Sequence, residues 1–239
     1  MIYIIIIILL VIIWGEKTKW RIITKIRENF DNIQNAFKNV LSKQEEKDFI
    51  KLLKILDKIC VENNINYVLV RGTLLGWARY KKRIPWDDDV DVAIPKKDFK
   101  KFASLSKKFE EYGIGITSIP SPGDTADFNK IFFINNKPIP HWKKRNKNVT
   151  FPFIDIFTYS DNQNVNKPKL VGGEEHFKGP VKILRSNFEG IKVNIPSNWK
   201  WYLDTLYNNW EVECCSSPYN HRKEKWQKSV CHDCNKLQI

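Results

Sequence analysis

Residues 67–94 read YVLVRGTLLGWARYKKRIPWDDDVDVAI, and this stretch decides the fold of the chain. The β-rich run 67–70 predicts a short strand that ends at Gly72, and the run 74–80 predicts a helix directly after it. Pro85 closes the following loop, because proline fixes its own φ and biases the residue before it toward extended geometry. The alternation of acidic and apolar residues up to position 94 then predicts a second strand.

The acids of this second strand are closely spaced, as Asp87, Asp88, Asp89 and Asp91. Side chains alternate between the two faces of a strand, so Asp89 and Asp91 share one face, and Asp87 joins them if the chain is already extended there. Carboxylates a few ångströms apart raise one another's pKa, and a divalent cation relieves this repulsion. Hard oxygen ligands suit Mg²⁺ or Mn²⁺. We therefore expect a metal site here rather than a solvated acidic turn.

The Gly72-Thr73 pair precedes the acids and lies between a predicted strand and a predicted helix. Such a turn leaves backbone N–H groups free at a helix N-terminus, where anions bind readily. The pair alone is weak evidence for a ligand. An anion site beside a pair of metal-binding acids indicates a bound phosphate.

A further acid, Asp155, stands alone at the centre of the apolar run 153–157. A carboxylate inside a buried strand is costly unless it is paired or bound to a metal. A salt bridge to a lysine or arginine is the alternative to metal binding at this position.

The stretch resembles the LicD/fukutin-related family of the nucleotidyltransferase fold, whose motif runs roughly G-T-L-L-G, then R, then I-P-W-D-D-D-hydrophobic-D. The residues that match are Gly72, Thr73, Leu74, Leu75, Gly76, Arg79, Ile84, Pro85, Trp86, Asp87, Asp88, Asp89 and Asp91. The run 153–157, FIDIF, is similar to the family's later strand that carries one acid. The chain departs from the motif at Arg71, where smaller residues are usual, and at the basic run 81–83.

The resemblance implies a fold and a reaction. The fold is α+β, a nucleotidyltransferase-like mixed β-sheet flanked by helices, here with an N-terminal apolar anchor. The reaction is the metal-dependent transfer of a phosphorylated alcohol, such as phosphocholine or ribitol phosphate, from a CDP-activated donor to a glycan hydroxyl on protein or lipid. CMP is the leaving group.

The resemblance also assigns roles to residues of this chain. Asp89, Asp91 and Asp155 are the expected ligands of Mg²⁺ or Mn²⁺, and Asp87 supports a second metal or orients the acceptor. Gly72 and Thr73 are expected to cradle a phosphate, with Arg79 adding a bidentate contact. The expected catalytic residues are therefore Asp87, Asp89, Asp91 and Asp155.

Two other function classes remain open for this sequence. One is a catalytically silent member of the same fold that binds a glycan or a protein partner, although the intact set of acids argues against it. The other is a basic nucleic-acid-binding nucleotidyltransferase, which the formal net charge of +13 and the 13% aromatic content favour. The apolar N-terminus and the cysteines near the C-terminus count against nucleic acid, so no nucleic-acid partner is expected.

The composition changes along the chain predict four segments. Residues 1–14 are uncharged and apolar, and we expect an uncleaved membrane anchor, although about 20 residues are needed to span a bilayer. Residues 15–41 form a stem, 42–212 the LicD-like domain and 213–239 a cysteine-rich tail. The basic residues after the apolar run favour a cytoplasmic flank. The resemblance implies instead a single-pass protein of the Golgi or ER lumen, with secretion as the alternative.

Apolar spacing predicts the remaining elements. A capping box at Ser42 starts a helix that runs to about residue 63, and further helices are expected at 95–112 and from 196 to about 210. Strands are expected at 114–119, 130–134 and 153–157.

Four of the five cysteines lie in the tail, as Cys214, Cys215, Cys231 and Cys234. They suit either a structural Zn²⁺ site, with His221 or His232 as a further ligand, or two disulfides. The spacing does not decide between these alternatives. In both, Cys231 and Cys234 lie within bonding reach of Cys214 or Cys215, and Cys60 remains alone in the core.

Overall fold

The computed structural model describes residues 15–16, 18–25, 33–120, 127–144, 148–162, 165, 170–171 and 174–237. The chain divides into two units, Met1–Lys38 and Asn39–Ile239. In the first unit, the described residues 18–25 and 33–36 are helical.

The apolar anchor expected at residues 1–14 lies outside the described residues. Within the part of the chain that is described, no helix combines the length and the apolar character needed to cross a bilayer. The localisation prediction is therefore corrected: a single-pass anchor in the Golgi or ER membrane is not supported.

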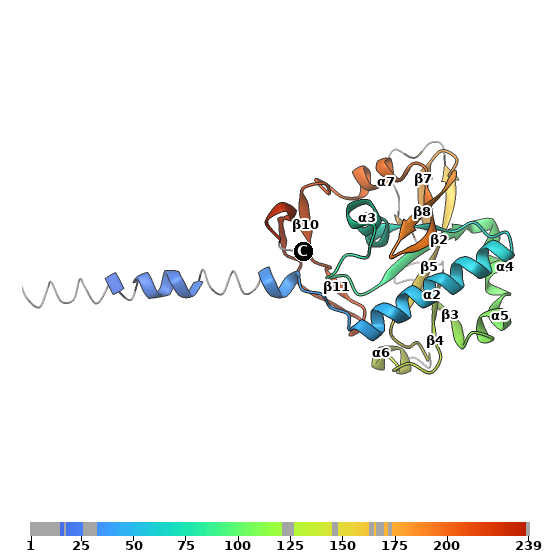
Figure 1. Ribbon diagram of the computed structural model, residues 1–239, viewed down its shortest axis with the longest axis horizontal. Coiled ribbons are helices and arrows are strands. Elements are labelled where there is room, and N and C mark those ends of the chain that lie inside the picture. Colours follow the sequence, from blue (N-terminus) through green and yellow to red (C-terminus); the bar gives the residue numbers. More distant parts are fainter. Residues whose placement is uncertain are drawn as a thin grey trace, which may run out of the picture. The chain divides into compact units, whose positions relative to one another are not determined.

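The second unit begins with helix α2 and ends in the cysteine-rich tail (Figure 1). Its helices are α2 (Lys43–Glu62), α3 (Arg71–Tyr80), α4 (Phe99–Ala103), α5 (Ser106–Glu110), α6 (Pro140–Lys143) and α7 (Trp199–Leu206), with 3₁₀ turns η1 (Lys96–Asp98) and η2 (Cys234–Lys236). Its longer strands are β2 (Val90–Pro95), β3 (Ile114–Pro120), β4 (Asp127–Phe133), β5 (Phe153–Asn162), β7 (Glu174–Lys178), β8 (Ile183–Phe188) and β9 (Ile191–Pro196). The short strands are β1 (Val68–Leu69), β6 (Leu170–Val171), β10 (Glu213–Cys215), β11 (Tyr219–Asn220), β12 (Lys225–Trp226) and β13 (Cys231–Asp233).

Among the described residues, seven strands form one mixed sheet. Five of them follow the order β1-β2-β5-β4-β3, and β7, which carries β6, pairs with the carboxyl half of β5. β2 and β7 run parallel to β5, while the other pairs are antiparallel. This arrangement confirms the α+β fold with a central mixed sheet and flanking helices.

Helix α2 packs against the sheet (Figure 1). The predicted capping box is present, because the backbone N–H of Glu45 donates to the hydroxyl of Ser42 and the Glu45 carboxylate accepts from the backbone N–H of Ser42. The buried side chains of the helix are Phe49, Leu52, Leu53, Ile55, Leu56, Ile59 and Cys60. Full burial of one such leucine stabilises a fold by about 1.5–3 kcal/mol. The helix therefore anchors the face of the sheet on which it lies.

The single helix predicted at 95–112 is wrong, since the structure breaks it into η1, α4 and α5. At the break, the hydroxyl of Ser104 donates to the carbonyl of Lys101, and such a local bond competes with helical hydrogen bonding. The aromatic side chains of Phe102 and Phe109 are nevertheless buried, as the spacing predicted.

A separate hairpin, β8–β9, supports the loop in front of the acids. Its two turn residues, Glu189 and Gly190, both have positive φ, as a tight type I′ turn requires. From this turn, the Glu189 carboxylate accepts from the backbone N–H of Arg83, and the Glu189 N–H donates to the carbonyl of Lys81. The hairpin thus holds the basic loop 81–83 in place.

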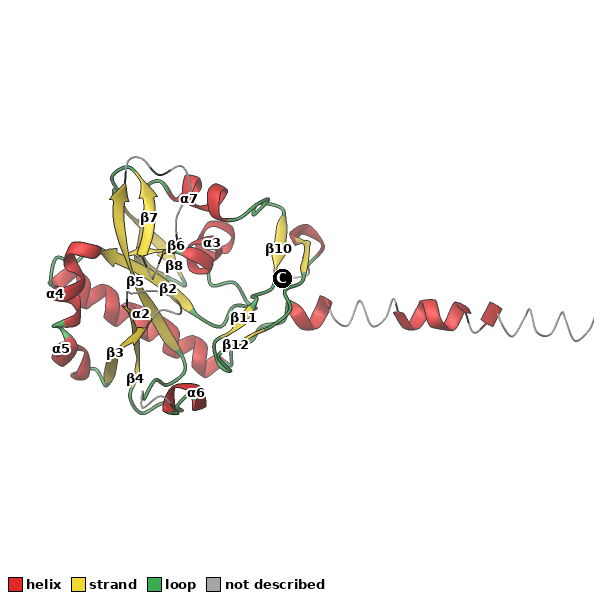
Figure 2. Ribbon diagram, turned by 180° about the vertical axis from the view of Figure 1, so that it is seen from behind, coloured by secondary structure: helices red, strands yellow, loops and turns green. Residues whose placement is uncertain are grey.

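The tail is closed by two disulfides: Cys215–Cys231 bridges the paired strands β10 and β13, and Cys214–Cys234 joins β10 to η2. Cys60 is buried with a free thiol. The predicted pairing is confirmed. Of the two alternatives left open, the structure has the disulfides, so these four sulfurs are not available as zinc thiolates. The tail strand β10 lies beside α3 in both views (Figures 1 and 2).

Candidate active site

Strand β2 and the residue before it carry the predicted metal ligands. Asp91 is the second residue of β2, and its Cα partner on the parallel strand β5 is Asp155. Paired residues of neighbouring strands project to the same face of a sheet. Asp89, directly before β2, reaches the same place, since its carboxylate lies within 4.8 Å of a carboxylate oxygen of Asp155. The structure thus brings the three predicted acids together at the amino ends of two central strands.

The Gly72-Thr73 turn holds this acidic segment. The backbone N–H of Asp91 donates to the hydroxyl of Thr73 at 2.8 Å, and both residues are buried. A Cβ atom at Gly72 would lie 2.6 Å from a carboxylate oxygen of Asp87, so any larger residue here would displace that carboxylate from its present position. The first turn of α3 therefore lies beside the carboxylate of Asp87.

Asp155 is also paired with a lysine that sequence reasoning did not single out. Lys130 on β4 is the Cα partner of Asp155, and its Nζ donates to Asp155 Oδ1 at 2.6 Å. The two side chains are only 2% and 5% exposed. The salt-bridge alternative for Asp155 thus holds for one carboxylate oxygen.

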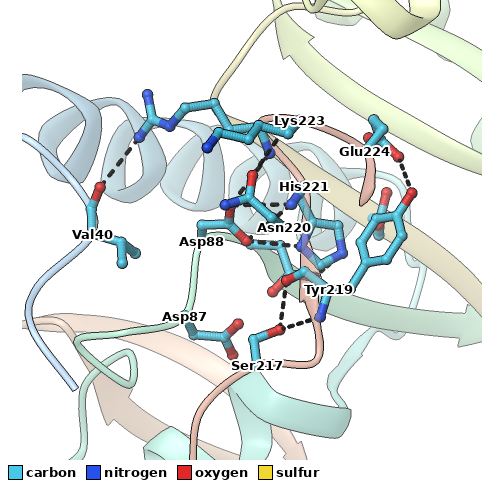
Figure 3. A network of polar contacts seen from close by, with 12 residues as sticks. Val40, Asp87, Asp88, Ser217, Tyr219, Asn220, His221, Lys223 and Glu224 are labelled. Atoms are coloured by element: carbon cyan, nitrogen blue, oxygen red, sulfur yellow. Dashed lines mark hydrogen bonds and ion pairs between the residues drawn. The ribbon is translucent and has the colours of Figure 1, made fainter. Parts of the chain in front are cut away.

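The tail adds a second group that the sequence did not place here, His221. Its Nδ1 lies 2.9 Å from Asp88 Oδ1, and its Nε2 lies 3.0 Å from Asp89 Oδ2. The backbone N–H groups of His221 and Arg222 also donate to Asp88 (Figure 3). The one available signal was that His221 lies between the paired cysteines, which had indicated only a possible zinc ligand. Nothing local in the sequence links it to acids 133 positions away.

The electrostatics of this cluster follow from burial and crowding. Burial raises the pKa of Asp89 well above its usual value, and the carboxylates of Asp87 and Asp155 add to the rise. Burial likewise raises the pKa of Asp87 to about 6. Burial alone would lower the pKa of His221, but the carboxylates of Asp89 and Asp88 raise it to about 10. The imidazolium therefore offsets part of the negative charge of the acids.

Asp88 behaves differently from its neighbours. Burial alone would raise its pKa, but the hydrogen bonds from His221 and the backbone N–H of Arg222 lower it. Asp88 is thus a stable carboxylate that orients the His221 ring, while Asp87, Asp89 and Asp91 face a cleft.

This cleft has a volume of about 560 Å³ and is bounded by α3, the acid run, the end of α7 and the tail. Its acidic wall is formed by Asp87, Asp89 and Asp91. Among the aromatic side chains that line it are Trp86, Tyr207, Trp210, Tyr219 and Trp226. Ligand sites of small molecules typically occupy 300–1,000 Å³, so the cleft is large enough for a nucleotide-linked donor.

The predicted phosphate contact, Arg79, lies in the wall of this cleft but already has partners. Its Nε donates to the carbonyl of Trp210 at 2.9 Å, and its Nη2 donates to the carbonyls of Trp210 and Glu213. In the structure Arg79 therefore joins α3 to the start of the tail.

Comparison with known proteins agrees with this geometry. The family described as LicD/FKTN/FKRP, nucleotidyltransferase domain, matches residues 64–198. The lipopolysaccharide cholinephosphotransferase LicD of Haemophilus influenzae is 28% identical over 136 residues, which are 56% of this chain and 49% of that protein. The uncharacterized protein RP689 of Rickettsia prowazekii is 29% identical over 99 residues, 41% of this chain and 35% of its own length. The chain thus spans about half, or less, of the length of these relatives.

The matched residues 64–198 include the Gly72 turn, the acid run and the strand of Asp155, but not the tail with His221. They make up more than half of the sequence, and they contain the motif on which the resemblance rests. The chain therefore belongs to the LicD/FKTN/FKRP family of nucleotidyltransferase domains.

Proposed function

We propose that the protein is a metal-dependent phosphotransferase. It moves a phosphorylated alcohol, of the phosphocholine or ribitol phosphate kind, from a CDP-activated donor to a glycan hydroxyl. The observation that carries this proposal is the convergence of Asp89, Asp155 and His221, whose ligand atoms all lie within 4.8 Å of one another beside a nucleotide-sized cleft. The relative in Haemophilus influenzae, named as a cholinephosphotransferase, supports the reaction class.

The donor atoms of this cluster fit a divalent cation. Asp89 and Asp91 supply carboxylate oxygens, and Asp155 has one oxygen left beside its bond to Lys130. His221 donates its Nδ1 hydrogen to Asp88 and turns Nε2 toward Asp89. A cation that displaces the Nε2 proton would therefore meet an imidazole that a carboxylate already holds in orientation. Carboxylates with one imidazole suit Mn²⁺ at least as well as Mg²⁺. When bound, the cation would stabilise the charge that develops on the leaving phosphate.

The other residues of the cleft position the reactants. Thr73 fixes the backbone of Asp91, so the acids cannot move away from α3. Asp87, whose pKa of about 6 lies close to neutral pH, is placed to accept the proton of the attacking hydroxyl. Tyr207 offers an aromatic face on which a nucleotide base can stack.

The test is a transfer assay with CDP-choline and CDP-ribitol as donors, in which the release of CMP is measured. We expect Asp89→Asn and Asp91→Asn each to abolish turnover while the circular dichroism spectrum stays unchanged. Asp98→Asn, on η1 outside the cleft, is the matched control and should retain activity. Retained turnover in either cleft variant would remove the mechanism.

Metal binding is measured separately from turnover. Mn²⁺ titration followed by electron paramagnetic resonance should show one tightly bound ion. His221→Gln should remove the nitrogen coupling to that ion and weaken its binding by about 10- to 100-fold, the range found when partners in metal sites are mutated. Unchanged nitrogen coupling in this variant would exclude His221 as a ligand.

A further inference from the structure

Arg71 stands at the start of α3, in the same cleft wall as Gly72 and Asp91. Its side chain is firmly held. Nε donates to Glu175 Oε1 at 2.6 Å, and the guanidinium carbon lies 3.7 Å from the centroid of the Phe157 ring. Glu175 is completely buried, and its second oxygen accepts from the hydroxyl of Tyr202 at 2.8 Å. The guanidinium is therefore fixed in orientation by a buried carboxylate and an aromatic face.

Most of the hydrogen-bonding capacity of Arg71 is unused. An arginine side chain has five N–H donors. Within the described part of the chain, only Nε of Arg71 has an acceptor. The side chain is 26% exposed, and Arg71 is one of the residues that line the cleft. Arg71 thus presents free donors and a positive charge to whatever occupies the cleft.

The arginines of α3 and of the loop that follows it, Arg79 and Arg83, are engaged. Arg79 donates to the carbonyls of Trp210 and Glu213. Arg83 donates through one nitrogen to three backbone carbonyls of the loop before the acids, the last of which is that of Asp87. The first turn of α3, expected to cradle a phosphate, lies beside the Asp87 carboxylate. Among these groups, Arg71 is the one that is both fixed and free to bind an anion.

The backbone conformation of Arg71 also indicates a functional position. Its φ is +50°, in the left-handed region that glycine occupies without strain and that other residues occupy at a cost of about 1–2 kcal/mol. The backbone N–H of Arg71 donates to the hydroxyl of Tyr202, so the same tyrosine holds both the backbone and, through Glu175, the side chain. Strained residues that are held by their surroundings cluster at functional sites.

We infer that Arg71 binds the phosphate oxygens of the activated donor, in the place that the sequence had assigned to Arg79. The planar guanidinium suits bidentate contact with a phosphoryl group. A pyrophosphate in the cleft would then contact Arg71 directly, while the acids would hold the cation. This inference rests on the proposed function for the identity of the donor, but it concerns only the anion subsite.

The probe is inorganic pyrophosphate, titrated calorimetrically into the full chain in the presence of Mn²⁺. Removing Arg71 alone would leave Glu175 buried without its partner, so the main variant is Arg71→Met with Glu175→Gln. We expect the dissociation constant to rise about 10- to 100-fold in this double variant, which is the range for losing charge-assisted hydrogen bonds. Arg71→Lys keeps the positive charge but not the paired N–H donors of the planar guanidinium, and it should weaken pyrophosphate binding by about tenfold.

Arg185→Met is the matched control, because it removes an arginine that pairs with Asp57 away from the cleft. Its affinity for pyrophosphate should stay within about twofold of the wild type. The inference is overturned if a folded double variant, with an unchanged circular dichroism spectrum, binds as tightly as the wild type. It is also overturned if the wild type does not bind pyrophosphate. If pyrophosphate binding depends on Arg71 but no CDP-alcohol is turned over, the proposed function fails and the anion subsite stands.

Discussion

Replacing Lys130 by methionine tests the energetics of the acid cluster directly. The substitution removes the ammonium group that lies 2.6 Å from Asp155 and leaves that carboxylate in a site where it is 5% exposed. Breaking a buried ion pair by removing one partner costs about 3–5 kcal/mol. For a protein of this size, the corresponding fall in the melting temperature is roughly 6–20 °C.

The assay is urea denaturation in the presence of EDTA, followed by tryptophan fluorescence. Lys96→Met is the matched control, because Lys96 lies at the same distance of 2.6 Å from Glu174 but is 66% exposed. Exposed pairs contribute about 0–1 kcal/mol, so the control should be nearly neutral. The reasoning is refuted if the two variants lose the same free energy of unfolding, or if Lys130→Met loses less than about 1 kcal/mol. When Mn²⁺ replaces EDTA, the free energy of unfolding should rise more for Lys130→Met than for the wild type, because a cation bound to Asp155 replaces the missing charge.

Two further predictions concern the supports of the site. Gly76→Ala should destabilise the fold by about 1–3 kcal/mol in urea denaturation, because its Cβ would lie 2.6 Å from a backbone oxygen of the loop before the acids. Gly72→Ala should cost less stability, because its Cβ meets only the movable carboxylate of Asp87, yet it should lower turnover more. Equal losses of stability in the two variants would contradict this prediction. Burial alone would raise the pKa of Glu45, but the hydrogen bond from Arg222 lowers it from 4.5 to about 2. The folded state therefore gains stability from the ionised Glu45 above pH 4.5 and loses it as the pH falls toward 2. The urea midpoint of the wild type should accordingly approach that of Glu45→Gln as the pH falls from 4.5 toward 2, and the difference between the two should stay constant above pH 4.5.

The parts of the fold that the sequence predicted well are those set by local patterns. The capping box at Ser42 and the buried stripe of α2 follow from helical periodicity, which needs only neighbouring residues. The alternation around Asp89 and Asp91 likewise predicted one acidic face, and the strand of Asp155 joined it because paired positions project to the same side. The family motif then supplied the chemistry that periodicity alone does not give.

The features that the sequence did not predict depend on contacts between distant segments. Lys130 meets Asp155 only because β4 and β5 pair in one particular register, and no local pattern fixes that register. Arg79 was assigned to a phosphate because its guanidinium suits one, yet backbone carbonyls at Trp210 and Glu213 satisfy it equally well. His221 lies among residues whose turns are held by disulfides rather than by apolar periodicity, so hydrophobic patterning contains no information about its position.

The tail that carries His221 has a consequence for the order in which the protein matures. The contact between His221 and Asp88 spans 133 positions, and bringing such distant segments together carries a substantial loop-closure entropy. The two disulfides enclose much shorter stretches, with separations of 20 and 16 residues, and they shape the loop before it meets the acids. Neither disulfide joins the tail to the sheet or to α2. We therefore expect that before oxidation the sheet and α2 are folded while the active site still lacks His221. Pairing of the cysteines, rather than formation of the sheet, then determines when the chain becomes active.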